Sequence, residues 1–140
     1  MRQEFRMSVG ADSGEVEKVN AVFAEFAKRY ALPEAVRRSV SIALDELLAN
    51  ELSHGMAGRE AGPVIVEVEL DQERLTATIT DDGPPFDPFG QAAPDTTLSV
   101  DDRQIGGIGL HLVRKLMDDV SYQRRDGHNV VVLVKRLVVG

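Results

Sequence analysis

Three short patterns in the sequence combine residue types that could bind a ligand or transfer a group. The first lies in DELLANELSHG, where Glu46, Asn50 and His54 follow one another at intervals of four residues. On a helix this spacing places the three side chains on one ridge. An asparagine oxygen is a suitable neutral ligand for Mg²⁺, and a glutamate one turn away could accept a proton from an attacking hydroxyl. Taken alone, the same spacing favours a solvated helix face.

The second pattern is ITDDGPPFDP, in which Asp81, Asp82 and Gly83 directly follow a predicted strand. A carboxylate in this place can accept a hydrogen bond from an exocyclic amine such as that of adenine, and the glycine lets a ring approach the backbone. Because Asp-Gly is also a common turn dipeptide, the pattern by itself favours a turn that ends a strand.

The third pattern is GGIGLHLVRKLMDDV, in which Gly107 and Gly109 immediately precede a helical periodicity. If the helix begins near Gly109, its free amide groups and positive dipole end face the preceding loop, and the glycines allow a phosphate to approach closely. The pattern is neither a P-loop nor a complete dinucleotide-binding fingerprint. By itself it favours a turn before a helix.

Hydrophobic periodicity predicts the elements that must position these patterns. They are a strand over Glu4–Val9, helices over Ser13–Tyr30 and Pro33–Ser53, strands over Val64–Leu70 and Leu75–Thr80, a helix to about Met117, and strands over Val120–Arg124 and Asn129–Val138. This order predicts an α/β fold, a two-layer sandwich whose mainly antiparallel sheet is covered on one face by helices. No regular pattern is found from Asp81 to Gly106, and so long a loop is usually functional or disordered.

Composition and charge limit the classes of function. A length of 140 residues predicts one domain over the whole chain. The net charge of -7 argues against nucleic acid and anionic membranes as partners, because both require a basic face. The absence of cysteine excludes disulfides and a thiolate zinc site. Because no apolar run has the length of a signal peptide, we expect a cytoplasmic protein.

In this order and separation, the three patterns resemble the N, G1 and G2 boxes of the GHKL ATP-binding fold, the Bergerat fold of gyrase, histidine kinases and MutL. The segments ALDELLANELSHG, DDGPPFDP and GGIGLHLVRKLMDDVSY narrow the resemblance to the small anti-sigma-factor serine kinases of the RsbW/SpoIIAB type. The most specific parts are PFDP and GLHLVRKLMD, and the resemblance covers nearly the whole chain.

The resemblance implies a Mg²⁺–ATP site with one role for each box. Asn50 would hold the Mg²⁺ that bridges the phosphates, and Glu46 would be the general base for a substrate serine. Asp81 would recognise the adenine amine, Gly83 would give the ring room, and residues 84–106 would form the ATP lid. The nucleotide-binding residues of the G2 box would be Gly107, Gly109 and Leu110.

The resemblance also implies partners. The protein would sequester a sigma factor and phosphorylate a serine of a STAS-type anti-sigma factor antagonist, and it would form a homodimer. The alternative is an ATP-binding regulatory interaction module of the same fold without phosphotransfer, in which ATP orders the lid and tunes partner affinity. An ATPase that drives clamping of a further domain is favoured less, because no further domain is predicted.

Some residues depart from the family pattern or carry no clear role. Glu51 follows Asn50 where the family commonly has a small residue, and it falls on the predicted apolar stripe. Pro84 and Pro85 replace a further glycine of many GHKL proteins, although this branch often has PPFDP. Arg103 fits a phosphate contact and equally a solvated loop residue. The basic residues interpreted as solvated charges are Arg114, Lys115, Arg124 and Arg125.

Overall fold

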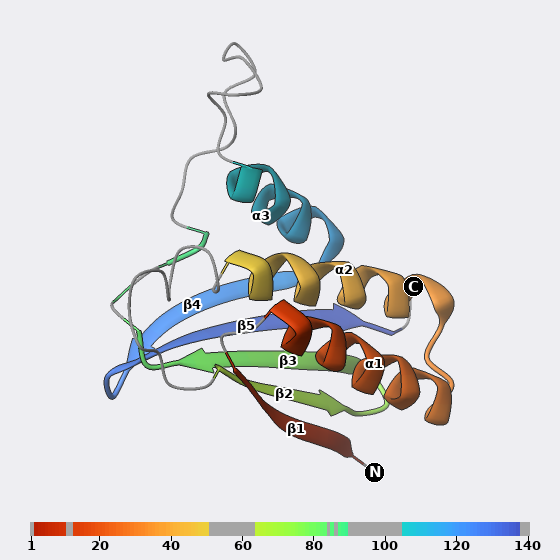
Figure 1. Cartoon of the computed structure of the whole chain (residues 1–140). Coiled ribbons are helices and arrows are strands. Elements are labelled where there is room, and N and C mark those ends of the chain that lie inside the picture. The colour runs from red at the N-terminus through yellow and green to blue at the C-terminus, as the bar shows by residue number, and fades with distance from the viewer. Residues whose placement is uncertain are drawn as a thin grey trace.

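A computed structural model describes residues 2–10, 13–50, 64–83, 85, 87–89 and 105–137, with backbone alone for residue 13 and for 105–110. The elements are β1 (Gln3–Val9), α1 (Ser13–Arg29), α2 (Glu34–Asn50), β2 (Val64–Leu70), β3 (Arg74–Asp81), α3 (Ile105–Leu116), β4 (Asp119–Arg125) and β5 (His128–Arg136). The strands form one sheet in the order β1-β2-β3-β5-β4, and each neighbouring pair is antiparallel. The helices lie on one face of this sheet (Figure 1), which confirms the predicted two-layer α/β fold.

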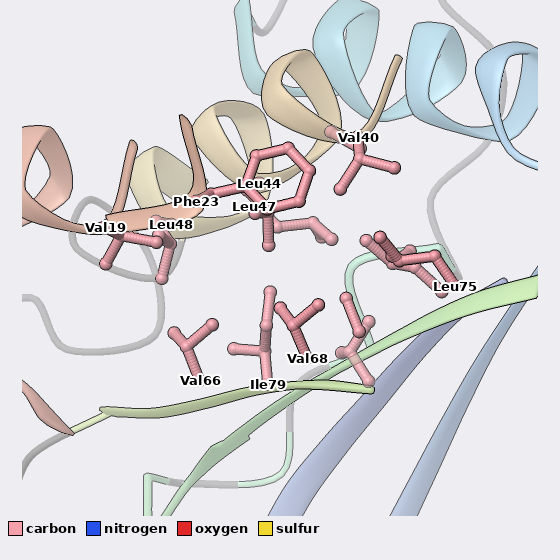
Figure 2. Close-up of a cluster of buried hydrophobic side chains, with 14 of the residues drawn as sticks. Val19, Phe23, Val40, Leu44, Leu47, Leu48, Val66, Val68, Leu75 and Ile79 are labelled. Carbon is pink, nitrogen blue, oxygen red and sulfur yellow. The ribbon is translucent and has the colours of Figure 1, made fainter. Parts of the chain in front are cut away.

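The core forms between the helices and the face of the sheet that they cover. Along β2 and β3 every second side chain is buried, as expected for strands with one covered face. The buried side chains of α2 recur at helical spacing and meet this face. Figure 2 shows the contributors from both layers, namely Val19, Phe23, Val40, Leu44, Leu47, Leu48, Val66, Val68, Leu75 and Ile79.

The strands β4 and β5 form a hairpin whose turn is the predicted Asp126-Gly127 pair. Asp126 and Gly127 have φ angles of 51° and 79°, the left-handed conformation that two-residue hairpin turns require. The register that follows pairs Arg125 with His128 and Arg124 with Asn129. The turn therefore fixes which residues of β5 face the helices, and Asn129 is one of them.

The end of α1 is a Schellman motif with alanine in the left-handed position. Ala31 has a φ of 54°. The amide of Leu32 donates to the carbonyl of Ala27 over 2.9 Å, and that of Ala31 donates to the carbonyl of Lys28 over 3.3 Å. These bonds satisfy carbonyl groups that the helix leaves free, but glycine usually occupies this position because a Cβ atom is strained there.

We therefore expect Ala31→Gly to stabilise the fold by about 0.5–1 kcal/mol, because it relieves the left-handed strain. Urea denaturation of the two proteins measures the difference. Ala24→Gly, at an exposed interior position of α1, is the matched control and should destabilise by about 1 kcal/mol. Equal losses at both positions would contradict the assigned backbone strain.

Candidate functional site

The end of β3 carries a buried carboxylate. Asp81 is the last residue of β3, its register partner on β5 is Asn129, and the two residues are 3% and 1% exposed. The Oδ1 atom of Asp81 accepts hydrogen bonds from the Gly83 amide over 2.7 Å and from Asn129 Nδ2 over 3.0 Å. Within the described parts of the chain, no donor lies within hydrogen-bond distance of the buried Oδ2 atom.

The free Oδ2 atom makes Asp81 suited to bind a donor group of a ligand. A buried acceptor without a partner costs about 1–3 kcal/mol, and a ligand amine placed beside it would remove that cost. A carboxylate accepts and does not donate, so the complementary ligand group is an N–H or O–H. This chemistry fits the role that the sequence predicts for Asp81 with the amine of adenine.

The turn after Asp81 is held by the β4–β5 hairpin. The carbonyl of Gly83 accepts a hydrogen bond from Arg124 Nη1 over 2.6 Å, and Asn129 Nδ2 lies 3.5 Å from the same oxygen. Arg124 is exposed, as the sequence predicts, but its guanidinium also holds the turn, a contact that the sequence did not indicate. Its partner is 41 residues away in the sequence, so no local pattern could have indicated the contact.

Residues of the N box lie at the end of α2. Asn50 is the last residue of that helix and is 3% exposed, whereas Glu46, one turn earlier, is half-buried. The pair thus lies at the edge of the buried face, as the helical spacing predicts. Glu51 and His54 are outside the described residues, and so is the segment over which α2 was expected to continue to Ser53.

The helix of the G2 box begins earlier than expected. It runs over Ile105–Leu116, so Gly107 and Gly109 lie inside its first turns and not before it. Glycine lowers helix propensity by about 1 kcal/mol but does not forbid helical backbone angles, which is why the expected start near Gly109 was wrong. In a helix that starts at Ile105, the amide of Gly107 has no acceptor within the helix, whereas those of Gly109 and Leu110 do.

The G2 box and the N box lie at the same end of the molecule as Asp81. In Figure 1 the N-terminal end of α3, the C-terminal end of α2 and the end of β3 all lie on the left, and α3 packs against α2. The fold therefore brings all three sequence patterns to one end of the sandwich. The predicted lid over residues 84–106 is described only at 85, 87–89 and 105–106, the last two of which belong to α3.

Arg114 connects the start of that predicted lid to α3. Its Nη2 atom donates to the carbonyl of Phe89 over 2.6 Å, and its guanidinium lies 5.3 Å from the centre of the Phe89 ring. Phe89 is 8% exposed and its amide donates to Asp87 Oδ1 over 2.9 Å. Arg114 is exposed, as the sequence predicts, but it also connects Phe89 to α3, a contact that the sequence did not indicate.

Sequence analysis missed Asn129 and Tyr122, which extend the contacts of Asp81. The Tyr122 hydroxyl donates to Asn129 Oδ1 over 2.6 Å. One signal could have indicated Asn129. In HNVVVLVKR it occupies the position that alternation assigns to the buried face, beside Val131 and Leu133, and a polar residue there requires a partner.

A hollow of about 480 Å³ lies at the same end of the sheet but opens on its other face. Ile65, Thr80 and Val130 are among its lining residues and alternate with the side chains that face the helices, and Asp81 and Asp82 line it as well. No described residue of α2 or α3 is among those that line it. It therefore includes Asp81 but neither Asn50 nor Glu46, which lie on the helix-covered side.

The described residues show neither a ready-made metal cluster nor a membrane-spanning helix. No group of three or more histidine, aspartate or glutamate side chains in these parts of the chain could hold a metal ion. A Mg²⁺ ion beside Asn50 would thus depend on ligand phosphates as well, which is how proteins commonly bind it. No described helix is long and apolar enough to cross a membrane.

Comparison with protein families identifies the class of this chain. The model of the histidine kinase-like ATPase domain matches residues 9–135, from the end of β1 almost to the end of β5. The chain therefore belongs to the histidine kinase-like ATPase family. This confirms the membership that the N, G1 and G2 boxes predict.

Curated relatives narrow the similarity within that family. The chain is 34% identical over 98 residues to the serine/threonine-protein kinase BtrW of Bordetella bronchiseptica, covering 70% of this chain and 69% of the relative. It is 31% identical over 102 residues to the serine-protein kinase RsbW of Listeria innocua, covering 66% and 62%. It is 29% identical over 97 residues to the anti-sigma F factor of Clostridium beijerinckii, covering 69% and 68%. The matches thus span about two thirds of each relative.

A solved structure shares the fold. A Mycobacterium tuberculosis protein, crystallised as its RsbU and RsbW domains, superposes with a TM-score of 0.70 and 16% sequence identity. The match covers 96% of this chain and 32% of that longer chain. It supports the arrangement of sheet and helices described above.

The contact between Arg124 and Gly83 leads to a test of stability. We expect Arg124→Ala to destabilise the fold by about 1 kcal/mol, because the Gly83 carbonyl loses a charge-assisted hydrogen bond in a partly buried place. Urea denaturation measures the loss. Arg125→Ala is the matched control, because Arg125 is likewise exposed but contacts only its strand neighbour Gln123 among the hydrogen bonds described, so its change should stay within about 0.5 kcal/mol. Equal effects of the two substitutions would show that the Gly83 contact contributes nothing.

Proposed function

We propose that this chain is an ATP-dependent protein-serine kinase that also acts as an anti-sigma factor. In this proposal it binds Mg²⁺–ATP, sequesters a sigma factor, and phosphorylates a serine of a STAS-type antagonist. The observation that carries the proposal is the buried Asp81 carboxylate with one free oxygen, in a chain of the histidine kinase-like ATPase family. The names of its relatives, serine-protein kinase and anti-sigma F factor, support the activity and the class of partner.

In this proposal, different residues at this end of the sandwich bind the adenine ring and the Mg²⁺ ion. Asp81 accepts a hydrogen bond from the amine of adenine, and the absence of a side chain at Gly83 leaves room for the ring. Asn50 is suited to Mg²⁺ because it offers a neutral oxygen ligand at the edge of the buried face. Bound with the phosphates, Mg²⁺ would neutralise the charge that develops on them.

The first turns of α3 face the phosphates in this proposal. The amide of Gly107 has no acceptor within the helix, so it can donate to an anion at the positive end of the helix dipole. Gly109 and Leu110 contribute close backbone approach and not free amides. Arg103 is an additional candidate for a phosphate contact, although it lies outside the described residues.

Glu46 has the position expected of a general base. The hydroxyl oxygen of the substrate serine forms a bond to the γ-phosphorus, while the bond from that phosphorus to the β–γ bridging oxygen breaks and ADP leaves. The proton of the hydroxyl passes to the Glu46 carboxylate. Positioning and neutralisation of charge supply most of the rate in such a transfer.

The proposed location and oligomeric state are inferred from the same relatives. A chain that regulates a sigma factor works in the cytoplasm, and we propose that it does so as a homodimer. Its net charge of -7 makes a direct contact with nucleic acid unfavourable. Phosphorylation of the antagonist would release it and leave the sigma factor bound, so the kinase step would control transcription.

Calorimetric titration with ATP, with and without Mg²⁺, tests the nucleotide site. We expect Mg²⁺-dependent binding that Asp81→Asn weakens by about tenfold or more, because the amide presents an N–H where a charged acceptor is needed. Asn50→Ala should weaken the binding that depends on Mg²⁺. Asp82→Asn, which changes the exposed neighbour, is the matched control and should bind as the parent does. A parent that binds no ATP would exclude the proposed function.

Transfer of labelled γ-phosphate tests the kinase step. With STAS-domain proteins from the same organism as acceptors, we expect Glu46→Gln to slow transfer about 10²–10⁴-fold, because it removes the proton acceptor. The matched control is Asp45→Asn, since Asp45 lies next to Glu46 on α2 but accepts a hydrogen bond from Asn20 of α1. If ATP binds and no acceptor is labelled, the chain is an ATP-binding interaction module without phosphotransfer.

A further inference from the structure

A chain of hydrogen bonds runs from the β4–β5 hairpin to Asp81. Tyr122 donates to Asn129 Oδ1 over 2.6 Å, and Asn129 Nδ2 donates to Asp81 Oδ1 over 3.0 Å. Tyr122 lies on β4, Asn129 on β5 and Asp81 on β3, so the chain crosses three adjacent strands. Neither residue was given a role by the sequence patterns, although Tyr122 is the last residue of the segment GGIGLHLVRKLMDDVSY.

The chemistry of the three groups fixes the direction of this chain. The oxygen of Asp81 can only accept, so the amide of Asn129 must turn its NH₂ group toward it. The amide oxygen of Asn129 then faces Tyr122, which can satisfy it only by donating its hydroxyl proton. If the amide were reversed, its oxygen would face the carboxylate oxygen of Asp81, and two acceptors would lie against each other. Each member of the chain thus holds the next in one orientation.

This orientation decides which oxygen of Asp81 remains for a ligand. Oδ1 already receives two donors, the Gly83 amide and Asn129. Oδ2 is buried and receives none from the described residues. Without the donor from Asn129, the carboxylate could rotate and share its two oxygens among the remaining donors, so that neither would be reserved for the nucleobase.

We infer that Tyr122 and Asn129 are positioning residues that set nucleobase selectivity, because they hold Asp81 with one oxygen directed to a nucleobase amine. The inference rests on the proposed function and deepens it. A 6-amino purine offers an N–H to the reserved oxygen. A 6-oxo purine would instead place its carbonyl oxygen, an acceptor, against the carboxylate oxygen, which is unfavourable in a buried site.

Arg124 supports the same turn from its other side. Its hydrogen bond to the Gly83 carbonyl and the Asx-type bond from the Gly83 amide to Asp81 hold the peptide that follows the carboxylate. Arg124 lies two residues after Tyr122 on β4, and alternation places both on the same side of that strand. The hairpin therefore holds the carboxylate and the glycine of the G1 box together.

A pair of nucleotides separates this role from a general effect on folding. ATP and purine riboside triphosphate differ by the 6-amino group, so the ratio of their dissociation constants measures the contact to Asp81. We expect the parent to prefer ATP by about tenfold. In Tyr122→Phe and in Asn129→Leu the preference should fall to within about threefold, while the affinity for purine riboside triphosphate stays within about twofold of the parent.

Two further proteins make the comparison specific. Tyr30→Phe removes the hydroxyl of the chain's only other tyrosine, which packs on Phe26 of α1, and it should keep the preference of the parent. In an Asp81→Asn background, Tyr122→Phe should change the ratio no further, because both substitutions act on one contact. Tyr122→Phe removes a single oxygen atom, so the test remains available if Asn129→Leu does not fold.

The outcomes distinguish this inference from the proposed function. Variants that keep the parent's preference, or that lose affinity for both nucleotides equally, would overturn the positioning role while leaving the ATP site intact. A parent that binds neither nucleotide would overturn the proposed function and the inference together. A preference that disappears in Tyr122→Phe and Asn129→Leu but persists in Tyr30→Phe would establish the inference.

Discussion

The register between β3 and β5 is the constraint on which the site depends. Ile79 faces Val131 and Ala77 faces Leu133 across this pair, and all four side chains are buried under the helices. A shift of β5 by one residue would turn Val131 and Leu133 to the uncovered face, at a cost of several kcal/mol for the lost apolar burial. The same register places Asp81 opposite Asn129. The apolar core thus determines the polar contact at the end of the strands.

A carboxylate can lie in this core only because polar partners accompany it. Burial of an unpaired charge is costly, whereas a carboxylate that accepts several hydrogen bonds is tolerated. Asn129 and the Gly83 amide satisfy one oxygen of Asp81, and Tyr122 satisfies the oxygen of Asn129. The remaining oxygen makes the site incomplete without a ligand donor. A buried group in this condition is expected at a functional site more than at a purely structural one.

Sequence periodicity was sufficient to predict the architecture. The alternation in VIVEVEL predicted β2 over its full length, and the helical spacing of Val36, Val40, Leu44 and Leu47 predicted the buried face of α2. The start of α3 could not be found in this way, because glycine shifts the balance against a helix without preventing one. The contacts of Arg114 and Arg124 join residues that are 25 and 41 positions apart. They result from the fold as a whole, so local patterns contain no information about them.

The two sides of the proposed site differ in how firmly they are held. The groups that hold Asp81 Oδ1 and the Gly83 carbonyl belong to the sheet and to the turn that leaves it, so their positions are coupled to the core. The groups proposed for the phosphates lie at the C-terminal end of α2 and the N-terminal end of α3, where a helix leaves backbone carbonyls and amides, respectively, without partners inside the helix. In the proposed site, recognition of the nucleobase would therefore remain constant while the phosphate side changes. For a kinase that also sequesters a partner, such a division would keep the nucleobase bound in both the ATP and the ADP state. Only the contacts to the phosphates would differ between the two states.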